Sequence, residues 1–132
     1  MVSRRFRCMI LTGEEQLAAH VWPNLLTWCI RRHGIGRVMD MVLGWIGSDT
    51  PIHLSFDVDA LDPMWAPSTG TPVRGGLTLR EGDFIAECVA ETGSLIALDL
   101  VEVNPSLDVQ GASDTVRAGC SIVRCALGDT LL

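Results

Sequence analysis

Two carboxylates at the end of an apolar run are the side chains of this sequence best suited to do chemistry. The run from Ile52 to Phe56 leads directly into Asp57 and Asp59. Side chains two residues apart in an extended segment point to the same side, so we expect both carboxylates to leave one face of a buried strand. Divalent cations that prefer oxygen ligands suit such a pair. The pair predicts a metal site, although two acids at this spacing are a weak signal alone.

A third acid occupies a matching position further along the chain. A second apolar run, 95–101, ends in Glu102, and a helical pattern that begins at Thr78 separates the two runs. Two buried strands joined by one helix form a right-handed unit with parallel strands, whose carboxyl ends share one edge of the sheet. We therefore expect Glu102 beside the Asp pair. Three carboxylates on one rim repel one another unless a cation lies among them.

The remaining elements are predicted from periodicity and turn residues. Apolar residues recur at helical spacing over 37–46, a strand buried on both faces is expected over 52–58, and a last helix begins at Ser113 or Asp114 and runs to about Leu127. Thr78 and Glu81 form a predicted capping box, and Gly93 ends that helix. Residues 60–77, rich in Pro, Gly, Ser and Thr, form a loop long enough to be functional.

The first thirty residues carry a weaker pattern. Helices over 14–22 and 24–32, separated by Pro23, are one interpretation. We predict two regions, an unassigned one over 1–30, helical or irregular, and a domain over 31–132. The basic residues Arg4, Arg5 and Arg7 could begin a targeting sequence, but the apolar run that follows is too short for a signal peptide.

Composition narrows the class of protein. A chain of 132 residues is expected to form one domain, and 48% apolar residues require a core or a partner. The net charge is −6 and Lys is absent, which argues against a nucleic-acid partner. The sequence contains no stretch approaching the ~20 apolar residues that cross a bilayer, so no membrane role is predicted.

Cysteines and histidines give no independent metal site. The five cysteines have no C-x-x-C spacing and are expected to be buried, reduced thiols. His53 shares the strand parity of Asp57 and could approach it, but a place in the core layer is favoured; His33 is expected to face solvent, and His20 has no ligand spacing around it. The cysteines are Cys8, Cys29, Cys88, Cys120 and Cys125.

The residues around the Asp pair resemble the signature of the ureohydrolases, which include the arginases, agmatinases and formiminoglutamases. The matching residues are Ser55, Asp57, Asp59, Pro63, Pro67, Ser68 and Gly76, continued by Thr69-Gly70-Thr71-Pro72, Gly75-Gly76-Leu77-Thr78 and Arg80-Glu81-Gly82. The stretches 97–105 and 34–39 resemble arginases more than agmatinases. The resemblance covers about residues 31–128.

The resemblance implies part of a three-layer α/β/α fold with parallel strands, in which the N-terminal half of the fold is missing. It implies a pair of manganese ions, with Asp57 bridging both and Asp59 binding one. A metal-bound hydroxide would attack the guanidinium carbon of L-arginine and yield L-ornithine and urea. Glu102 would hold the planar guanidinium, and Thr71 would assist from the loop.

One departure from the family pattern changes the expected activity. Two upstream ligand stretches of the family, Gly-Gly-Asp-His and Asp-x-His-x-Asp, are absent. No complete set of catalytic residues is therefore expected. We predict that the chain is a truncated isoform or the carboxyl-terminal portion of an arginase, an enzyme of arginine metabolism and the urea cycle. By itself, the chain is expected to be inactive or to have very weak activity. The alternatives are a non-catalytic chain that forms a homo-oligomer or associates with full-length arginase subunits, an incompletely predicted gene product that does not fold alone, and an agmatinase-like enzyme. A cytoplasmic or mitochondrial location is expected.

Overall fold

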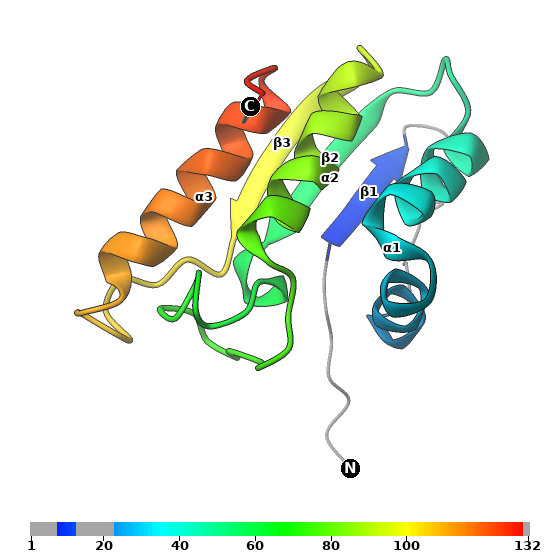
Figure 1. Cartoon of the computed structure of the whole chain (residues 1–132). Helices are drawn as coiled ribbons and strands as arrows, with labels where there is room; N and C mark the ends of the chain where they lie inside the picture. Colours follow the sequence, from blue (N-terminus) through cyan, green and yellow to red (C-terminus); the bar gives the residue numbers. More distant parts are fainter. Residues whose placement is uncertain (1–7, 13–22, 131–132) are drawn as a thin grey trace.

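A small sheet with helices packed against it forms the framework of the chain (Figure 1). The computed structural model describes residues 8–12 and 23–130, and their side chains from residue 29 onward. The elements in chain order are β1 (Cys8–Thr12), α1 (Pro23–Ile46), β2 (Ile52–Asp57), a 3-10 turn (Val58–Ala60), α2 (Leu79–Glu91), β3 (Leu95–Val101) and α3 (Ala112–Ala126).

The strand–helix–strand unit predicted from the two apolar runs is confirmed. The strand order is β1-β2-β3, and β2 and β3 are parallel, with α2 between them in sequence. Asp57 pairs with Val101, so both strands reach the same edge of the sheet with their carboxyl ends. No periodic pattern in the sequence predicts β1, which pairs antiparallel to β2, with Cys8 opposite Phe56.

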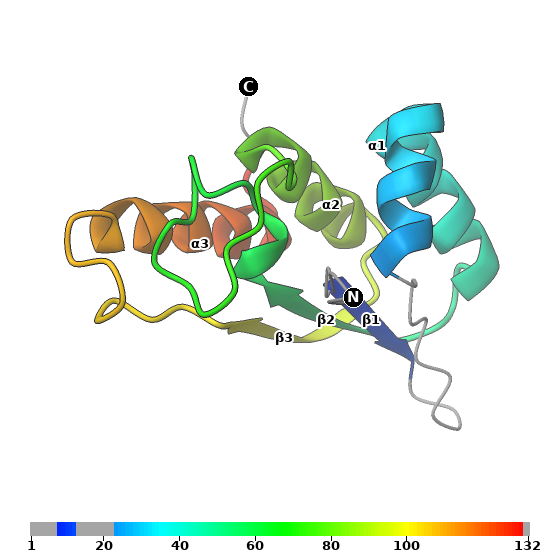
Figure 2. The same ribbon diagram turned by 90° about the horizontal axis from the view of Figure 1, so that it is seen from below.

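The described helices all cover the same face of the sheet (Figure 2). Leu54 and Phe56 of β2 point into this layer and are 0% exposed, and Leu98 and Leu100 of β3 pack against the same core. The alternate residues of β2, such as Ser55, are only half-buried. The prediction that this strand is buried on both faces is therefore wrong for the described residues, because no described helix lies on the second face.

The first helix is kinked in the middle. Gly34 has φ 77° and ψ 158°, a backbone conformation that glycine adopts without a steric penalty, and it divides α1 into two helical segments. These segments match the helices predicted over 24–32 and 37–46. The helix predicted over 14–22 lies outside the described residues. Val38 and Met39 are buried, whereas Trp45 is 57% exposed.

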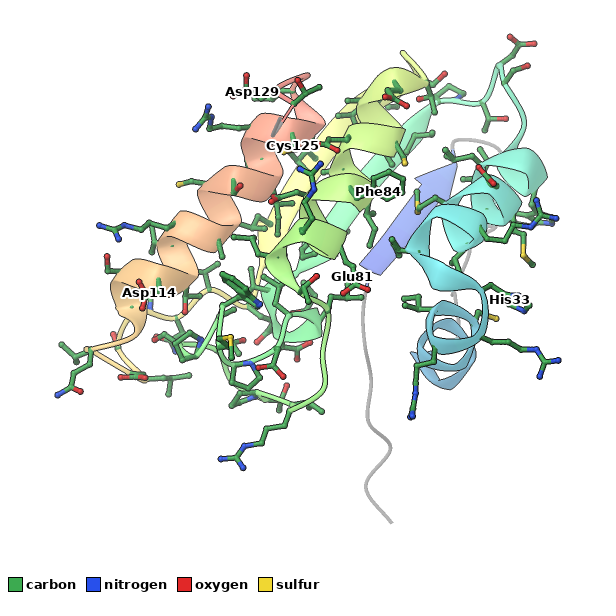
Figure 3. The ribbon with its side chains drawn as sticks, viewed as in Figure 1. His33, Glu81, Phe84, Asp114, Cys125 and Asp129 are labelled. Atoms are coloured by element: carbon green, nitrogen blue, oxygen red, sulfur yellow. The ribbon has the colours of Figure 1, made fainter. Side chains whose placement is uncertain are left out.

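The capping signals hold for α2 and fail for α3. Thr78 and Glu81 form the predicted capping box, with Glu81 in the first turn of α2 (Figure 3). Gly93 has φ 67° and follows the end of that helix. Ser113 or Asp114 was expected to cap α3, but both lie inside its first turn. The preceding turn is instead held by Asp108, whose carboxylate accepts the N–H groups of residues 110 and 111.

The described cysteines are free thiols in different environments. Cys125 is buried, as predicted, and Cys29 and Cys88 are half-buried, but Cys120 is exposed on α3, so the general prediction of buried thiols is wrong there. Burial raises the pKa of both Cys88 and Cys125 to about 11. Over the described part of the chain, no helix has the length and apolar character needed to span a membrane.

Candidate functional site

The two aspartates come together through a turn that follows β2. Asp57 is the last residue of the strand, and the chain then enters the 3-10 turn that contains Asp59. The backbone N–H of Asp59 donates to Asp57 Oδ1 at 3.0 Å. The predicted strand through Val58 is therefore one residue too long, and a tight turn replaces the expected extended pair. Both side chains are buried, with exposures of 5% and 8%.

This burial makes the pair electrostatically costly without a counter-charge. Burial raises the pKa of Asp57 from 3.8 to about 7; the N–H of Asp59 opposes this shift, whereas the negative charges of Asp59 and Glu102 add to it. Asp59 Oδ1 is buried and has no hydrogen-bond partner. A cation at this position would stabilise both carboxylates and satisfy the unpaired oxygen.

The loop after the turn is anchored by its own backbone. Leu61 and Leu77 form an isolated bridge, in which Asp62 N donates to Leu77 O and Leu77 N donates to Ala60 O, both at 2.8 Å. The Asp62 carboxylate accepts the N–H of Gly75 at 2.7 Å. The backbone amides that hold Asp62 keep the pKa of its carboxyl group below its ordinary value. These contacts give the loop a defined shape despite its length.

Thr71 and Glu102 complete the site from two different segments. Thr71 Oγ1 donates to Asp59 Oδ2 at 2.5 Å. Glu102 follows β3, is exposed, and has φ 65°, which side chains with a Cβ rarely adopt. A Cβ built on Gly70 would lie 3.4 Å from Glu102 Oε2, so Gly70 places the loop close to this carboxylate. The structure thus brings all four predicted site residues to one edge of the sheet.

The two histidines that the structure describes do not join this group. His53 alternates along β2 with Leu54, which packs in the core, so it lies on the other face of the sheet, where its Nε2 is 3.1 Å from Asp99 Oδ2. The prediction of a place in the core layer is therefore wrong, because that face has no described helix to bury it. His33 is exposed on α1, as predicted, and His20 lies outside the described residues.

Sequence reasoning missed three hydroxyl residues that support the site. Ser68, Thr69 and Thr115 are buried and form hydrogen bonds between the loop after β2 and the segments after β3. Ser68 and Thr69 belong to the motif quoted above, but nothing in the sequence shows that their hydroxyls bind the segments after β3. Thr115 carried no signal, because a single Thr in an amphipathic helix has no distinguishing pattern.

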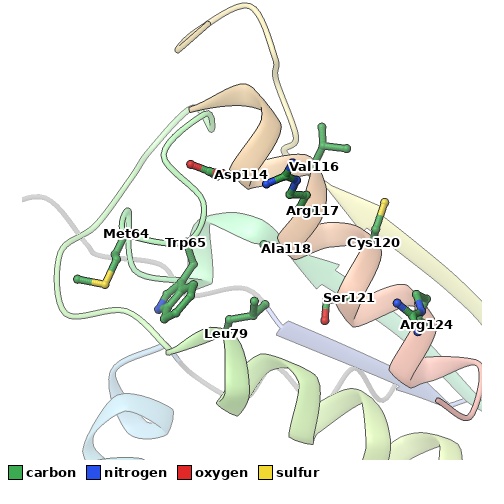
Figure 4. Close-up of a pocket in the computed structure, with 10 residues that line it drawn as sticks. All are labelled: Met64, Trp65, Leu79, Asp114, Val116, Arg117, Ala118, Cys120, Ser121 and Arg124. Atoms are coloured by element: carbon green, nitrogen blue, oxygen red, sulfur yellow. The ribbon is translucent and has the colours of Figure 1, made fainter. Parts of the chain in front are cut away.

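A hollow of about 580 Å³ lies elsewhere, between the outer side of α3, the start of α2 and the loop (Figure 4). None of the four predicted site residues lines it. Its lining residues are Met64, Trp65, Leu79, Asp114, Val116, Arg117, Ala118, Cys120, Ser121 and Arg124.

The fold and site together define an α/β protein whose candidate site lies at the carboxyl edge of its parallel strands. A family model described as "Arginase family" matches residues 13–128, which is most of the chain. The chain belongs to the arginase family. This result confirms the family resemblance and the partial α/β fold.

Relatives of known sequence are considerably longer than this chain. An arginase of Emericella nidulans is 80% identical over 103 residues, which are 78% of this chain and 32% of that protein. An arginase of Neurospora crassa is 80% identical over 107 residues, covering 78% of this chain and 30% of that protein. The chain therefore spans about a third of the length of these relatives.

Solved structures agree on the fold and on the limited coverage. A Bacillus subtilis arginase superposes with a TM-score of 0.72 at 36% identity, covering 80% of this chain and 36% of that one. An arginase from the yeast Glaciozyma antarctica gives a TM-score of 0.64 at 47% identity, covering 80% and 34% of the two chains.

Proposed function

We propose that this chain carries the guanidinium-recognition side of an arginase-type site, which hydrolyses L-arginine to L-ornithine and urea. Membership of the arginase family supports the reaction class. The observation that carries the proposal is the convergence of Asp57, Asp59, Thr71 and Glu102, from three segments, at one sheet edge.

Glu102 is the proposed guanidinium-binding group. A guanidinium presents a planar fork of N–H donors, and a carboxylate can accept two of them in parallel. The Glu102 side chain is exposed and therefore accessible to a ligand. Gly70 lies against its Oε2 without a side chain that would cover it. The Thr71 hydroxyl donates its hydrogen bond to the Asp59 carboxylate, which fixes that carboxylate relative to the loop.

The described residues fit a manganese pair only in part. Asp57 and Asp59 offer two carboxylates with an unsatisfied buried oxygen, which suits a cation. However, residues 29–130 contain no group of three or more His, Cys, Asp or Glu side chains that could hold a metal ion. Catalytic metal sites usually take three protein ligands per ion. We therefore infer that the described residues do not hold the ions alone and that this chain by itself has little or no turnover.

Two measurements on the purified chain test this proposal. NMR titration with L-arginine is expected to shift the resonances of Glu102 and Thr71, and Glu102→Gln is expected to abolish the response. Urea release in the presence of manganese is expected to stay below roughly 1% of that of a full-length arginase, a loss of about 2.7 kcal/mol or more in transition-state stabilisation. Agmatine, the decarboxylated analogue, provides the comparison for an agmatinase-like preference. Arginine binding that is insensitive to Glu102→Gln would refute the assigned role.

A second candidate function is association with full-length arginase subunits. One observation favours it: the described helices leave the second face of the sheet uncovered (Figure 2). On β3, Val101 alternates with the core-packed Leu100 and is 38% exposed, and Ile96, at the register shift of the same strand, is 71% exposed. Exposed strands with apolar residues favour association. Co-elution with a full-length arginase in size-exclusion chromatography, weakened by Ile96→Asn, would support this candidate, and separate elution would exclude it.

A further inference from the structure

Two buried hydroxyl residues, far apart in sequence, connect the loop after β2 to the segment after β3. Ser68 and Thr115 are both 0% exposed. Ser68 N donates to Thr115 Oγ1 at 2.8 Å, and that hydroxyl in turn donates to Gly111 O at 3.2 Å. Ser68 Oγ donates to Asn104 O at 2.6 Å and accepts Asp108 N at 3.1 Å, while Ser68 O accepts Asn104 N at 3.1 Å. Every polar atom of Ser68 therefore has a partner from the other segment.

The residues that follow Ser68 contact the candidate site directly. Thr69 Oγ1 donates to the backbone carbonyl of Glu102 at 2.9 Å. Glu102 has φ 65°, and a residue with a Cβ keeps this conformation only where its surroundings determine it. Gly70 lies against the Glu102 carboxylate, and Thr71 donates to Asp59. Four consecutive residues thus link a buried anchor to both sides of the site.

We propose that Thr115 is a positioning residue of the guanidinium site. Its hydroxyl fixes Ser68, and the fixed segment then holds Glu102 in its left-handed backbone conformation and Thr71 against Asp59. The Thr115 hydroxyl is hydrogen-bonded to Ser68 and to Gly111, so it acts on the site through the segment 68–71. The inference deepens the proposed function and rests on it for the identity of the ligand.

The chain offers a matched pair of substitutions for the test. Thr115→Val removes the hydroxyl at nearly constant volume, and Thr115→Ser restores it. Thr92→Val is the control, because Thr92 makes the same kinds of hydrogen bond as Thr115. Its Oγ1 donates to the backbone carbonyl of Val89, one helical turn earlier, at 2.7 Å, and accepts the backbone N–H of Ser94 at 3.1 Å. Thr92 lies at the end of α2 that is remote from the site.

Amide hydrogen exchange and arginine titration of the full chain provide the readouts. In Thr115→Val we expect exchange at Ser68, Asn104 and Asp108 to accelerate roughly tenfold or more, because a buried N–H loses its acceptor and the local structure opens more readily. The concentration of L-arginine at which the NMR shift change of Glu102 reaches half of its maximum is expected to rise by about the same factor. Thr115→Ser should restore both values, whereas Thr92→Val should change neither.

The outcomes separate a positioning role from a purely structural one. If Thr115→Val accelerates exchange uniformly along the chain, or weakens arginine binding no more than Thr92→Val does, the inference is wrong. Should Thr115→Val fail to fold, Thr69→Val tests the same connection one step later; it must alter the Glu102 backbone resonances and weaken arginine binding, and unchanged values overturn the inference. Failure of the unsubstituted chain to bind arginine would count against the proposed function, while the exchange data still decide the role of Thr115.

Discussion

Substitution of Gly76 by Ala tests how the site-bearing loop is anchored. A Cβ at this position would lie 2.6 Å from the carbonyl carbon of Leu61, and 2.7 Å from both Ala60 O and Asp62 N. Comfortable contacts between carbon atoms are about 3.5–4.0 Å. All three crowding atoms belong to the main chain, so no side-chain rotation can relieve an overlap of about 1 Å.

The expected cost follows from what must move. Separating the two backbones by about 1 Å would break the hydrogen bonds Asp62 N to Leu77 O and Leu77 N to Ala60 O, now 2.8 Å each. Two hydrogen bonds contribute about 1 kcal/mol each, and overpacking costs about 1–3 kcal/mol, against a gain of up to about 1 kcal/mol from the stiffer unfolded chain. We expect Gly76→Ala to lower the free energy of unfolding by about 2–4 kcal/mol and Tm by roughly 10 °C.

Thermal and urea unfolding followed by circular dichroism measure this cost. Gly44→Ala is the matched control, because Gly44 lies in α1 with no heavy atom within 4 Å of its built Cβ. The same chemical change should there stabilise the chain by up to about 1 kcal/mol through helix propensity. A Gly76→Ala chain that unfolds at the wild-type temperature would refute the reasoning about the loop anchor.

Three further predictions concern single side chains. Glu102→Gly should leave the unfolding free energy within about 1 kcal/mol of wild type, because glycine adopts the left-handed backbone conformation of this position without strain. The same substitution should abolish the arginine-induced NMR shifts. A larger loss of stability would contradict this expectation. Asp83 is 1% exposed and burial raises its pKa, so ionisation of this carboxyl group opposes folding. The wild-type chain should therefore lose stability relative to Asp83→Asn as pH rises above 3.8, the ordinary pKa of the group. A difference in unfolding free energy between the two chains that is independent of pH would refute this. Maleimide should label Cys120 faster than Cys88 and Cys125 in the folded chain, as followed by mass spectrometry, and equal labelling rates would contradict the described burial.

The elements that place the site could be predicted because their signals are local. The apolar runs ending at Asp57 and Glu102, and the capping box at Thr78, lie within short windows of sequence. Their parallel arrangement then follows from the handedness of strand–helix–strand connections. These local features are sufficient to place Glu102 beside the aspartates.

Features set by distant contacts could not be predicted. Ser68 and Thr115 are hydrogen-bonded across 47 positions of sequence, and a single Thr gives no periodic signal. The turn after Asp57 is stabilised by the aspartate itself, which accepts the N–H of Asp59 and ends the strand one residue early. The half-buried state of His53 depends on which face of the sheet the helices cover, a property of the whole fold.

We propose above that this chain carries the guanidinium-binding and carboxylate portion of an arginase-type site. The most direct test replaces the matching segment of the Emericella nidulans arginase with residues 31–128 of this chain and measures urea release from L-arginine with manganese. We expect the chimera to release urea at a rate within roughly tenfold of the parent enzyme, a difference of about 1.4 kcal/mol, and to lose this activity on Glu102→Gln. A folded chimera that releases no urea would contradict it.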